Sequence, residues 1–443
     1  MSAPTLATDD VVAGLIESRS AVRRAAGTGR AVVTGIGVIA PNGIGTGTYW
    51  EAVLAQRSGI APISLFDPSD YPVRVAGEVD DFVVREYLPS TLEVQTDRWT
   101  QLGLAASSMA LSDADLDPAT LPEYAVSVVT ASSSGGTDFG QREIESLWAR
   151  GPEYVTTYQS IAWFYAATTG QISIRHGLRG PCGVIASEQA GGLDALAQAR
   201  RLLRAGDSVE AVLAGGTDAS LCPYGLVSQL STGRINPTGD PEGAFLPFDI
   251  SAAGYVPGEG GAMLVIEDRE AAIRRGVRTG YGEIAGYGAT FDPPPGSGRP
   301  PTLGRAIRLA LADAEVAAGE VDVVFADGMG RPDLDRAEAE TITELFGPGG
   351  VPVTVPKTLT GRMYAGGACL DVATALLSLR DGVIPPTAGI TELAPGCTDL
   401  DLVTGLARPT RPKVALVLAR GFGGFNAAMV LRGPSSMSPE DAA

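Results

Sequence analysis

Histidine is almost missing from this sequence, which has one, His176, among its 443 residues. Cysteine is scarce as well, and the four cysteines (Cys182, Cys222, Cys369 and Cys397) form no CxxC pair. No Cys/His cluster therefore has the spacing of a metal site, and a Ser-His-Asp triad would have to recruit His176 without a GxSxG motif. We expect His176 to be a hydrogen-bonded scaffold residue and the cysteines to be buried thiols in a reducing compartment.

Positive charge and long apolar runs are also lacking. The chain has 33 Lys and Arg against 51 Asp and Glu, a formal net charge of −18. This balance argues against nucleic acid or an anionic membrane as a partner. No apolar run approaches the roughly 18 residues of a membrane span, and Asp9 and Asp10 lie where a signal peptide would be basic and then apolar. We therefore expect a cytoplasmic protein.

Buried strands alternate with helices along the chain, for example a strand expected at 126–131 and an amphipathic helix expected at 303–314. This alternation predicts an α/β fold. The chain is too long for one hydrophobic core, and a second series of elements starts near residue 282 and repeats the first only loosely. The last strand that the pattern predicts covers residues 414–419. We divide the chain into an N-terminal arm with a weak helical pattern at 11–26 (1–29), a first half (30–275), a second half (276–433) and a disordered tail (434–443).

The segment Ser187–Gly192, SEQAGG, is the most informative stretch. A short apolar run precedes it and a helix-like segment, 193–203, follows it. Strand, turn of small residues and helix is the layout that exposes a nucleophile at a helix N-terminus. The residue at the turn is Gln189, however, and an amide cannot form a thioester. We expect Gln189 to be a space-filling amide that is hydrogen-bonded at this turn.

A formal dinucleotide-binding fingerprint is present at Gly35, Gly37 and Ala40. Pro41-Asn42-Gly43 then follows where a helix should open, so we disfavour nucleotide binding.

Three motifs, in this order and spacing, resemble those of β-ketoacyl synthases of the thiolase superfamily. They are TGIG at 34–37, PFD with GYVPGEG at 247–260, and GFGGFN at 421–426. The resemblance covers residues 30 to about 433. It implies a thiolase-like fold with two related halves in an α-β-α-β-α layered arrangement.

The departures from this family lie at its chemistry. A decarboxylating ketosynthase uses a cysteine to accept the acyl chain and two histidines to assist decarboxylation and stabilise the developing charge. The matching positions here are Gln189, Asp327 (in ADGMG, 326–330) and Arg362 (in KTLTGR, 357–362), whereas Lys357 is retained. A carboxylate and a guanidinium that replace two facing histidines would form a salt bridge. The alternative is that each charge has a separate partner or water.

A ketosynthase scaffold without its three catalytic residues is similar to the chain length factor, or ketosynthase β subunit, of type II aromatic polyketide synthases. That resemblance implies a heterodimer with a catalytic ketosynthase α subunit, and a polyketide tunnel at their interface. It also implies an acyl carrier protein that binds mainly through the partner and carries the polyketide on phosphopantetheine, with no cofactor in this subunit. Whether the chain is itself an enzyme stays open.

The resemblance also places the residues that set product length. Counted back from Gln189, Thr137, Gly140 and Ile144 fall at the family's gating positions, on one face of a predicted helix. None is bulky, so we expect a long tunnel and a decaketide or larger product; the alternative is that this face packs against the partner. Further positions expected at the far end of the tunnel are Ile161, Tyr224 and Leu226.

Two other functions remain open. Loading-type ketosynthases with glutamine at this position promote malonyl decarboxylation, although they keep their histidines and this chain does not. A purely structural thiolase-fold protein with no tunnel is the other possibility. The aromatic segment 158–165 is either core or partner interface.

Overall fold

The computed structural model of the chain describes residues 29–205 and 208–437. The helical pattern expected at 11–26 lies outside these residues.

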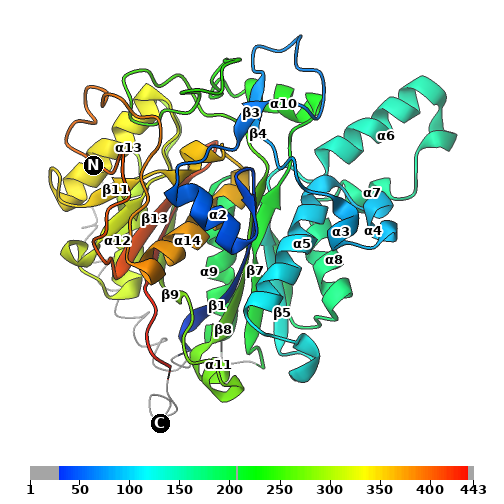
Figure 1. Ribbon diagram of the computed structural model, residues 1–443, viewed down its shortest axis with the longest axis horizontal. Helices are drawn as coiled ribbons and strands as arrows, with labels where there is room; N and C mark the ends of the chain where they lie inside the picture. Colours follow the sequence, from blue (N-terminus) through cyan, green and yellow to red (C-terminus); the bar gives the residue numbers. More distant parts are fainter. Residues whose placement is uncertain (1–28, 206–207, 438–443) are drawn as a thin grey trace, which may run out of the picture.

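A mixed sheet of twelve strands is the framework of the described part (Figure 1). The strands of its first half are β1 (Ala31–Ala40), β2 (Gly43–Ile44), β5 (Val126–Ala131), β6 (Cys182–Ile185), β7 (Ala211–Asp218) and β8 (Gly260–Asp268). Those of its second half are β9 (Gly282–Phe291), β10 (Val323–Phe325), β11 (Pro352–Thr354), β12 (Asp401–Leu402), β13 (Val414–Arg420) and β14 (Phe425–Arg432). The order is β12-β11-β10-β13-β14-β9-β1-β8-β7-β5-β6, with β2 paired to β1, and β1 and β9 join the halves.

Two helices, α9 (Ala190–Arg204) and α14 (Tyr364–Asp381), lie in the middle of the molecule with strands on both sides (Figure 1). Helix α9 packs on β5 and β7 and also on β14, and α14 packs on β7, β8 and β13. Helix α5 (Arg98–Asp113) covers β1 and β8, and α12 (Leu303–Ala314) covers β9 and β14. The result is the predicted five-layer arrangement of helices and strands.

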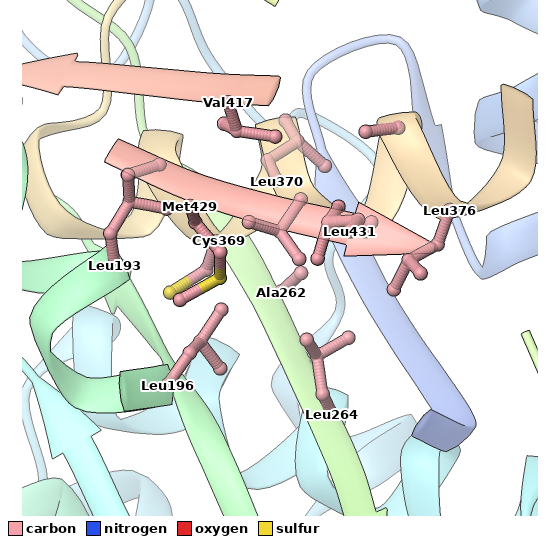
Figure 2. Packing of buried hydrophobic residues seen from close by; sticks show 14 of the residues in the cluster. Leu193, Leu196, Ala262, Leu264, Cys369, Leu370, Leu376, Val417, Met429 and Leu431 are labelled. Carbon is pink, nitrogen blue, oxygen red and sulfur yellow. The ribbon is translucent and has the colours of Figure 1, made fainter. Parts of the chain in front are cut away.

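The core between the two central helices is apolar and tightly packed. Figure 2 shows Leu193 and Leu196 of α9 beside Cys369 of α14, with Met429 of β14 above and Leu264 of β8 below. These side chains are buried almost completely. Both faces of the two helices are therefore covered, which fixes where their N-termini meet the strand ends.

Paired glycines allow a helix to pack closely on a strand at two places in the sheet. A side-chain carbon at Gly35 or Gly37 of β1 would lie 2.3 or 2.0 Å from a carbonyl oxygen of α5. A side-chain carbon at Gly286 or Gly288 of β9 would lie 2.2 or 2.3 Å from a carbonyl oxygen of α12. Each pair lets a helix lie directly on a strand. The glycines of β1 thus serve helix packing.

Two predictions near the C-terminus are corrected. The strand at 414–419 is not the last, because β14 follows it in the centre of the sheet, between β13 and β9. The glycine-rich loop at 421–424 connects these two strands. Its turn signal led us to overlook the strand that follows it. The disordered tail that we expected from residue 434 is also wrong at Met437. This residue is buried against Val32 and Ala272, and its backbone N donates to the backbone oxygen of Arg278 at 3.0 Å.

Helix α6 (Thr137–Arg150) projects from the body of the molecule at the upper right of Figure 1. Its main contacts are with short elements, α7 (Gln159–Ala162) and α10 (Pro223–Leu230) among them. The other helices are α2 (Thr46–Leu54), α3 (Val84–Tyr87), α4 (Ser90–Gln95), α8 (Ala167–His176), α11 (Arg269–Arg275) and α13 (Pro332–Phe346), and β3 (Ile60–Pro62) and β4 (Val75–Gly77) form a small separate sheet. Within the described ranges no helix is long and apolar enough to cross a membrane.

Candidate functional site

The fold brings the residues at the former catalytic positions to one end of the central helix layer. Gln189 directly precedes α9, and Arg362 lies two residues before α14. Asp327 follows β10, and Lys357 lies in the single 3-10 turn at Pro356–Leu359 that follows β11. Because helix N-termini and the carboxyl ends of parallel strands meet here, residues distant in sequence share one buried site.

Asp327 and Arg362 form the salt bridge that the sequence suggested. Arg362 Nη1 donates to Asp327 Oδ2 at 3.1 Å, and Nη2 donates to Oδ1 at 3.0 Å. The side chains are 0% and 1% exposed. The backbone N of Arg420 also donates to Asp327 Oδ1 at 3.0 Å, and Arg362 Nη2 donates to the Arg420 oxygen at 2.6 Å. The pair therefore also ties the end of β13 to the site.

Lys357 completes a second buried ion pair beside the first. Its Nζ lies 2.7 Å from Asp371 Oδ2 and donates to the backbone oxygens of Ala326 at 3.0 Å and Asp327 at 2.9 Å. Burial alone would raise the pKa of Asp327, but Arg362 and then Lys357 hold it below its ordinary value. Burial raises the pKa of Asp371 to about 6, with Lys357 opposing the shift. The cluster holds its charges in fixed pairs, so Asp327 has no role open to it as a general base near neutral pH.

Gln189 is buried completely, and the structure corrects one expectation about it. Neither its Nε2 nor its Oε1 hydrogen bonds to any residue in the described part of the chain. A side-chain carbon at Gly367 would lie 2.9 Å from Gln189 Nε2, so α14 closes tightly over the amide. The predicted hydrogen-bonded amide is therefore wrong, and space filling against α14 is what the geometry shows.

Glu188 belongs to the site although the sequence did not single it out. Its backbone is left-handed, with φ of 52°. Glu188 Oε2 accepts from the backbone N of Gln189 at 2.7 Å and of Phe422 at 3.1 Å, so it joins the start of α9 to the glycine loop at 421–424. Burial raises its pKa, and Arg362 opposes that shift. The backbone conformation that creates this link leaves no signal in the sequence.

A cavity of about 390 Å³ opens beside Glu188. Its wall consists of Ser133, Ser134, Thr137, Glu188, Ser220, Tyr224, Gly225, Ser228, Thr232, Arg234, Tyr255, Tyr364 and Phe422. Neither Gln189 nor the Asp327–Arg362 pair is part of this wall. The former reaction centre is therefore shut off from the cavity that remains.

The six residues expected along the tunnel do not all meet at this cavity. Thr137 and Tyr224 line it. Gly140 faces Trp163, since a side-chain carbon there would lie 2.8 Å from the Trp163 ring. Leu226 is fully buried in a separate apolar cluster, which contradicts its assignment to the tunnel. The two remaining residues, Ile144 and Ile161, are about half exposed outside the cavity.

A second cavity of about 420 Å³ lies on the outer side of the glycine loop, between it and the loop at 292–299. The two cavities have Arg234 and Phe422 in common. The Arg234 guanidinium lies 4.8 Å from the centroid of the Phe422 ring, a cation–π distance. This stacked pair forms the partition between the cavities.

Large apolar side chains are exposed on α6 and α7 and on the residues that directly follow these two helices. We define the α6–α7 apolar surface by its exposed members, Ile144, Leu147, Trp148, Tyr154, Ile161, Trp163, Phe164 and Tyr165. Trp148 is 82% exposed. The aromatic residues of segment 158–165 are therefore not core, which resolves that alternative for Trp163, Phe164 and Tyr165. An exposed apolar patch of this kind marks an interaction surface.

The single histidine and the four cysteines take no part in the two buried ion pairs. His176 ends α8, and its Nε2 is buried with no hydrogen-bond partner among the described residues, contrary to expectation. Burial lowers the pKa of His176 to about 4. Cys182 is exposed, so the prediction of buried cysteines fails there and holds for the other three. Across residues 29–205 and 208–437, no group of three or more His, Cys, Asp or Glu residues could hold a metal ion.

Comparison with known proteins agrees with this arrangement. The family models for the N-terminal and C-terminal domains of β-ketoacyl synthase match residues 29–272 and 281–391. The tetracenomycin polyketide synthase ketoacyl synthase β subunit of Streptomyces glaucescens is 59% identical over 401 residues, which cover 90% of this chain and 98% of the relative.

Two solved structures share the fold. The ishigamide ketosynthase/chain length factor has a TM-score of 0.82 and 29% identity, and the match covers 91% of this chain and 99% of that chain. A type II polyketide synthase acyl-carrier protein in complex with its ketosynthase bound to the hexaketide has a TM-score of 0.81 and 25% identity, with 91% and 99% covered.

Proposed function

The chain belongs to the β-ketoacyl synthase family, as a ketosynthase β subunit of a type II polyketide synthase, and from this premise we propose how it works. It is a chain length factor: it pairs with a catalytic ketosynthase α subunit and shapes the tunnel that holds the growing poly-β-ketone. The observation that carries this function is the buried Asp327–Arg362 pair at the former histidine positions, with Gln189 at the former cysteine position.

The site has no means of condensation by itself. Gln189 offers no thiolate to accept an acyl chain, and both carboxylate oxygens of Asp327 already accept from the Arg362 guanidinium. The partner subunit therefore supplies the nucleophile. The polyketide reaches the complex on the phosphopantetheine of an acyl carrier protein, and a net charge of −18 favours docking of that acidic carrier on the partner.

The α6–α7 apolar surface is the proposed contact with the ketosynthase α subunit. It combines three features of such interfaces: aromatic residues, a projecting helix and little packing on its own body. Thr137, at the base of α6, lines the 390 Å³ cavity, so the cavity reaches the root of this surface. A tunnel that begins in the partner would continue here.

Product length follows from the side chains at this root. Thr137 lines the cavity and is small, so we infer a wide passage and a decaketide or larger product. Because Gly140 lies against Trp163, a bulky residue at 140 would also displace that ring, and Thr137 is the cleaner position to test.

The experiment is co-expression of Thr137→Phe with the ketosynthase α subunit and acyl carrier protein, followed by mass measurement of the products. We expect a shorter polyketide, because the added ring fills the cavity. Thr410→Phe, on an exposed loop far from the cavity, is the matched control and should leave the product unchanged. Unchanged length with Thr137→Phe would contradict the tunnel assignment.

Malonyl decarboxylation by Gln189 has one observation in its favour, the unpaired amide. A malonyl group could use both amide atoms if it reached them. Gln189→Ala in the reconstituted complex tests this activity. Malonyl decarboxylation by Gln189 would be favoured if the variant lost decarboxylation but still made products of the same length when acetyl groups were supplied for priming.

A further inference from the structure

A third cavity, of about 560 Å³, lies at the opposite end of α14 from the Asp327–Arg362 pair. Its wall combines the last turn of α14 (379–382), the start of β13 (411–414), the end of β14 with the residues that follow (432–435), and Arg30 just before β1. Helix α14 has 18 residues, so about 27 Å separates this cavity from the former reaction centre.

The cavity is strongly basic in a strongly acidic protein. One acid, Asp381, lies in its wall among five cationic side chains, which are Arg30, Arg380, Arg411, Lys413 and Arg432. The chain as a whole carries −18. The five cations come from four segments that are distant in the sequence, so their gathering in an acidic protein needs a reason.

The single acid pairs with one of these cations, Arg380, and leaves the others. Asp381 Oδ2 accepts from Trp50 Nε1 at 2.7 Å, and Oδ1 accepts from Arg380 Nε at 2.6 Å, so its oxygens are already in use. Arg30 Nε donates to Glu283, which lies outside the cavity wall. These contacts fix two arginines at the rim.

Arg411 and Lys413 are left without such partners. Neither side chain has a hydrogen bond or ion pair to any residue that the structure describes, and both are exposed at the cavity. Arg432 is held by a single hydrogen bond from Nη2 to the backbone oxygen of Ala314, at 2.9 Å. Three cationic groups therefore have donors available to a ligand.

The backbone at Arg411 is also unusual. Its φ is 55°, a left-handed conformation that costs a non-glycine residue free energy and persists where its surroundings impose it. Its backbone N donates to the oxygen of Gly382 at 2.9 Å, which anchors it to the end of α14. The macrodipole of α14 accounts for a cation such as Arg380 in its last turn. It does not account for Arg411 and Lys413, which come from a different element.

We propose that this basic cavity binds a small ligand that carries a chain of phosphates, of the class of the nucleoside and other organic triphosphates. Arginine forks and a lysine ammonium match phosphate oxygens in geometry and charge. The volume lies in the usual range for a small-molecule site. The site is separate from the proposed polyketide tunnel and does not depend on it.

The test is isothermal titration calorimetry of the full chain with inorganic tripolyphosphate and, separately, with ATP, at physiological ionic strength. We expect saturable binding of both probes. The double variant Arg411→Ala/Lys413→Ala should weaken it at least about tenfold. Arg305→Ala/Arg308→Ala removes two exposed charges from α12, away from the cavity, and is the matched control that should bind as the unmodified chain does.

The outcomes separate clearly. Equal affinity for the two probes means that the phosphates alone are recognised, and tighter binding of ATP means that the cavity also contacts the organic part; both support the site. Absence of binding, undiminished binding by Arg411→Ala/Lys413→Ala, or equal loss in the control would overturn it. Binding that appears only in a chain shortened to end at Met437 would show that the chain's own acidic end fills the cavity, and would also overturn it.

Discussion

The buried Asp327–Arg362 pair allows a quantitative prediction. Asp327→Asn keeps the size of the side chain but removes its charge, so the fully buried guanidinium of Arg362 loses both charged acceptors. The backbone N of Arg420 keeps an acceptor only if the new amide presents its oxygen there. An unpaired buried charge costs about 3–5 kcal/mol. We expect the free energy of unfolding to fall by about that amount.

The double variant Asp327→Leu/Arg362→Met measures the interaction between the two side chains apart from their contacts with other residues. Because it removes both charges, it should be less destabilised than the sum of Asp327→Leu and Arg362→Met alone. The coupling free energy should be about 2–3 kcal/mol. Urea denaturation followed by circular dichroism measures all four proteins.

An exposed ion pair supplies the control. Arg85 and Glu93 lie 2.8 Å apart with side chains 73% and 34% exposed. Glu93→Gln should therefore cost less than about 1 kcal/mol. The reasoning is refuted if Asp327→Asn costs no more than Glu93→Gln, or if the coupling free energy is zero.

The same pair has a defined dependence on pH. The folded-state pKa of Asp327 is held below its ordinary value of 3.8, so its contribution is fully present above that value. It is lost only as the pH falls through the lowered folded-state pKa. The difference between the unmodified chain and Asp327→Asn should thus stay constant from neutral pH down to about 4 and shrink only below it.

Three further predictions concern the partner surface, a buried acid and the packing of β1. Trp148→Asp should abolish co-purification with the ketosynthase α subunit, whereas Leu406→Asp, equally exposed elsewhere, should not. Burial raises the pKa of Asp97 to about 7, so the folded state keeps a proton that the unfolded state has lost; stability should fall as the pH rises from about 4 to 7, and Asp97→Asn should flatten that slope in urea denaturation. Gly37→Val should prevent soluble expression, because its side chain would meet a backbone oxygen of α5 at 2.0 Å; normal folding would contradict the close-packing argument.

Local patterns made much of the fold predictable. Helix α12 was expected over 303–314 and β5 over 126–131, and both have those bounds, because an amphipathic or fully apolar run records the burial of its own residues. Strand β14 was missed because its small residues, such as Ala427 and Ala428, pack in the centre of the sheet without a periodic signal. Its place depends on pairing with β13 and β9, which lie on other parts of the chain.

The sequence by itself determined which chemistry is absent. A glutamine at 189 cannot form a thioester, and Asp327 and Arg362 cannot replace two histidines in decarboxylation. Only the tertiary structure decided what these residues do instead. Contacts between Asp327 and Arg362, or between Glu188 and Phe422, depend on backbone paths that no local pattern encodes. The same holds for the basic cavity, whose side chains come from segments between residues 30 and 435. Composition fixes the available groups, and long-range packing fixes which of them meet.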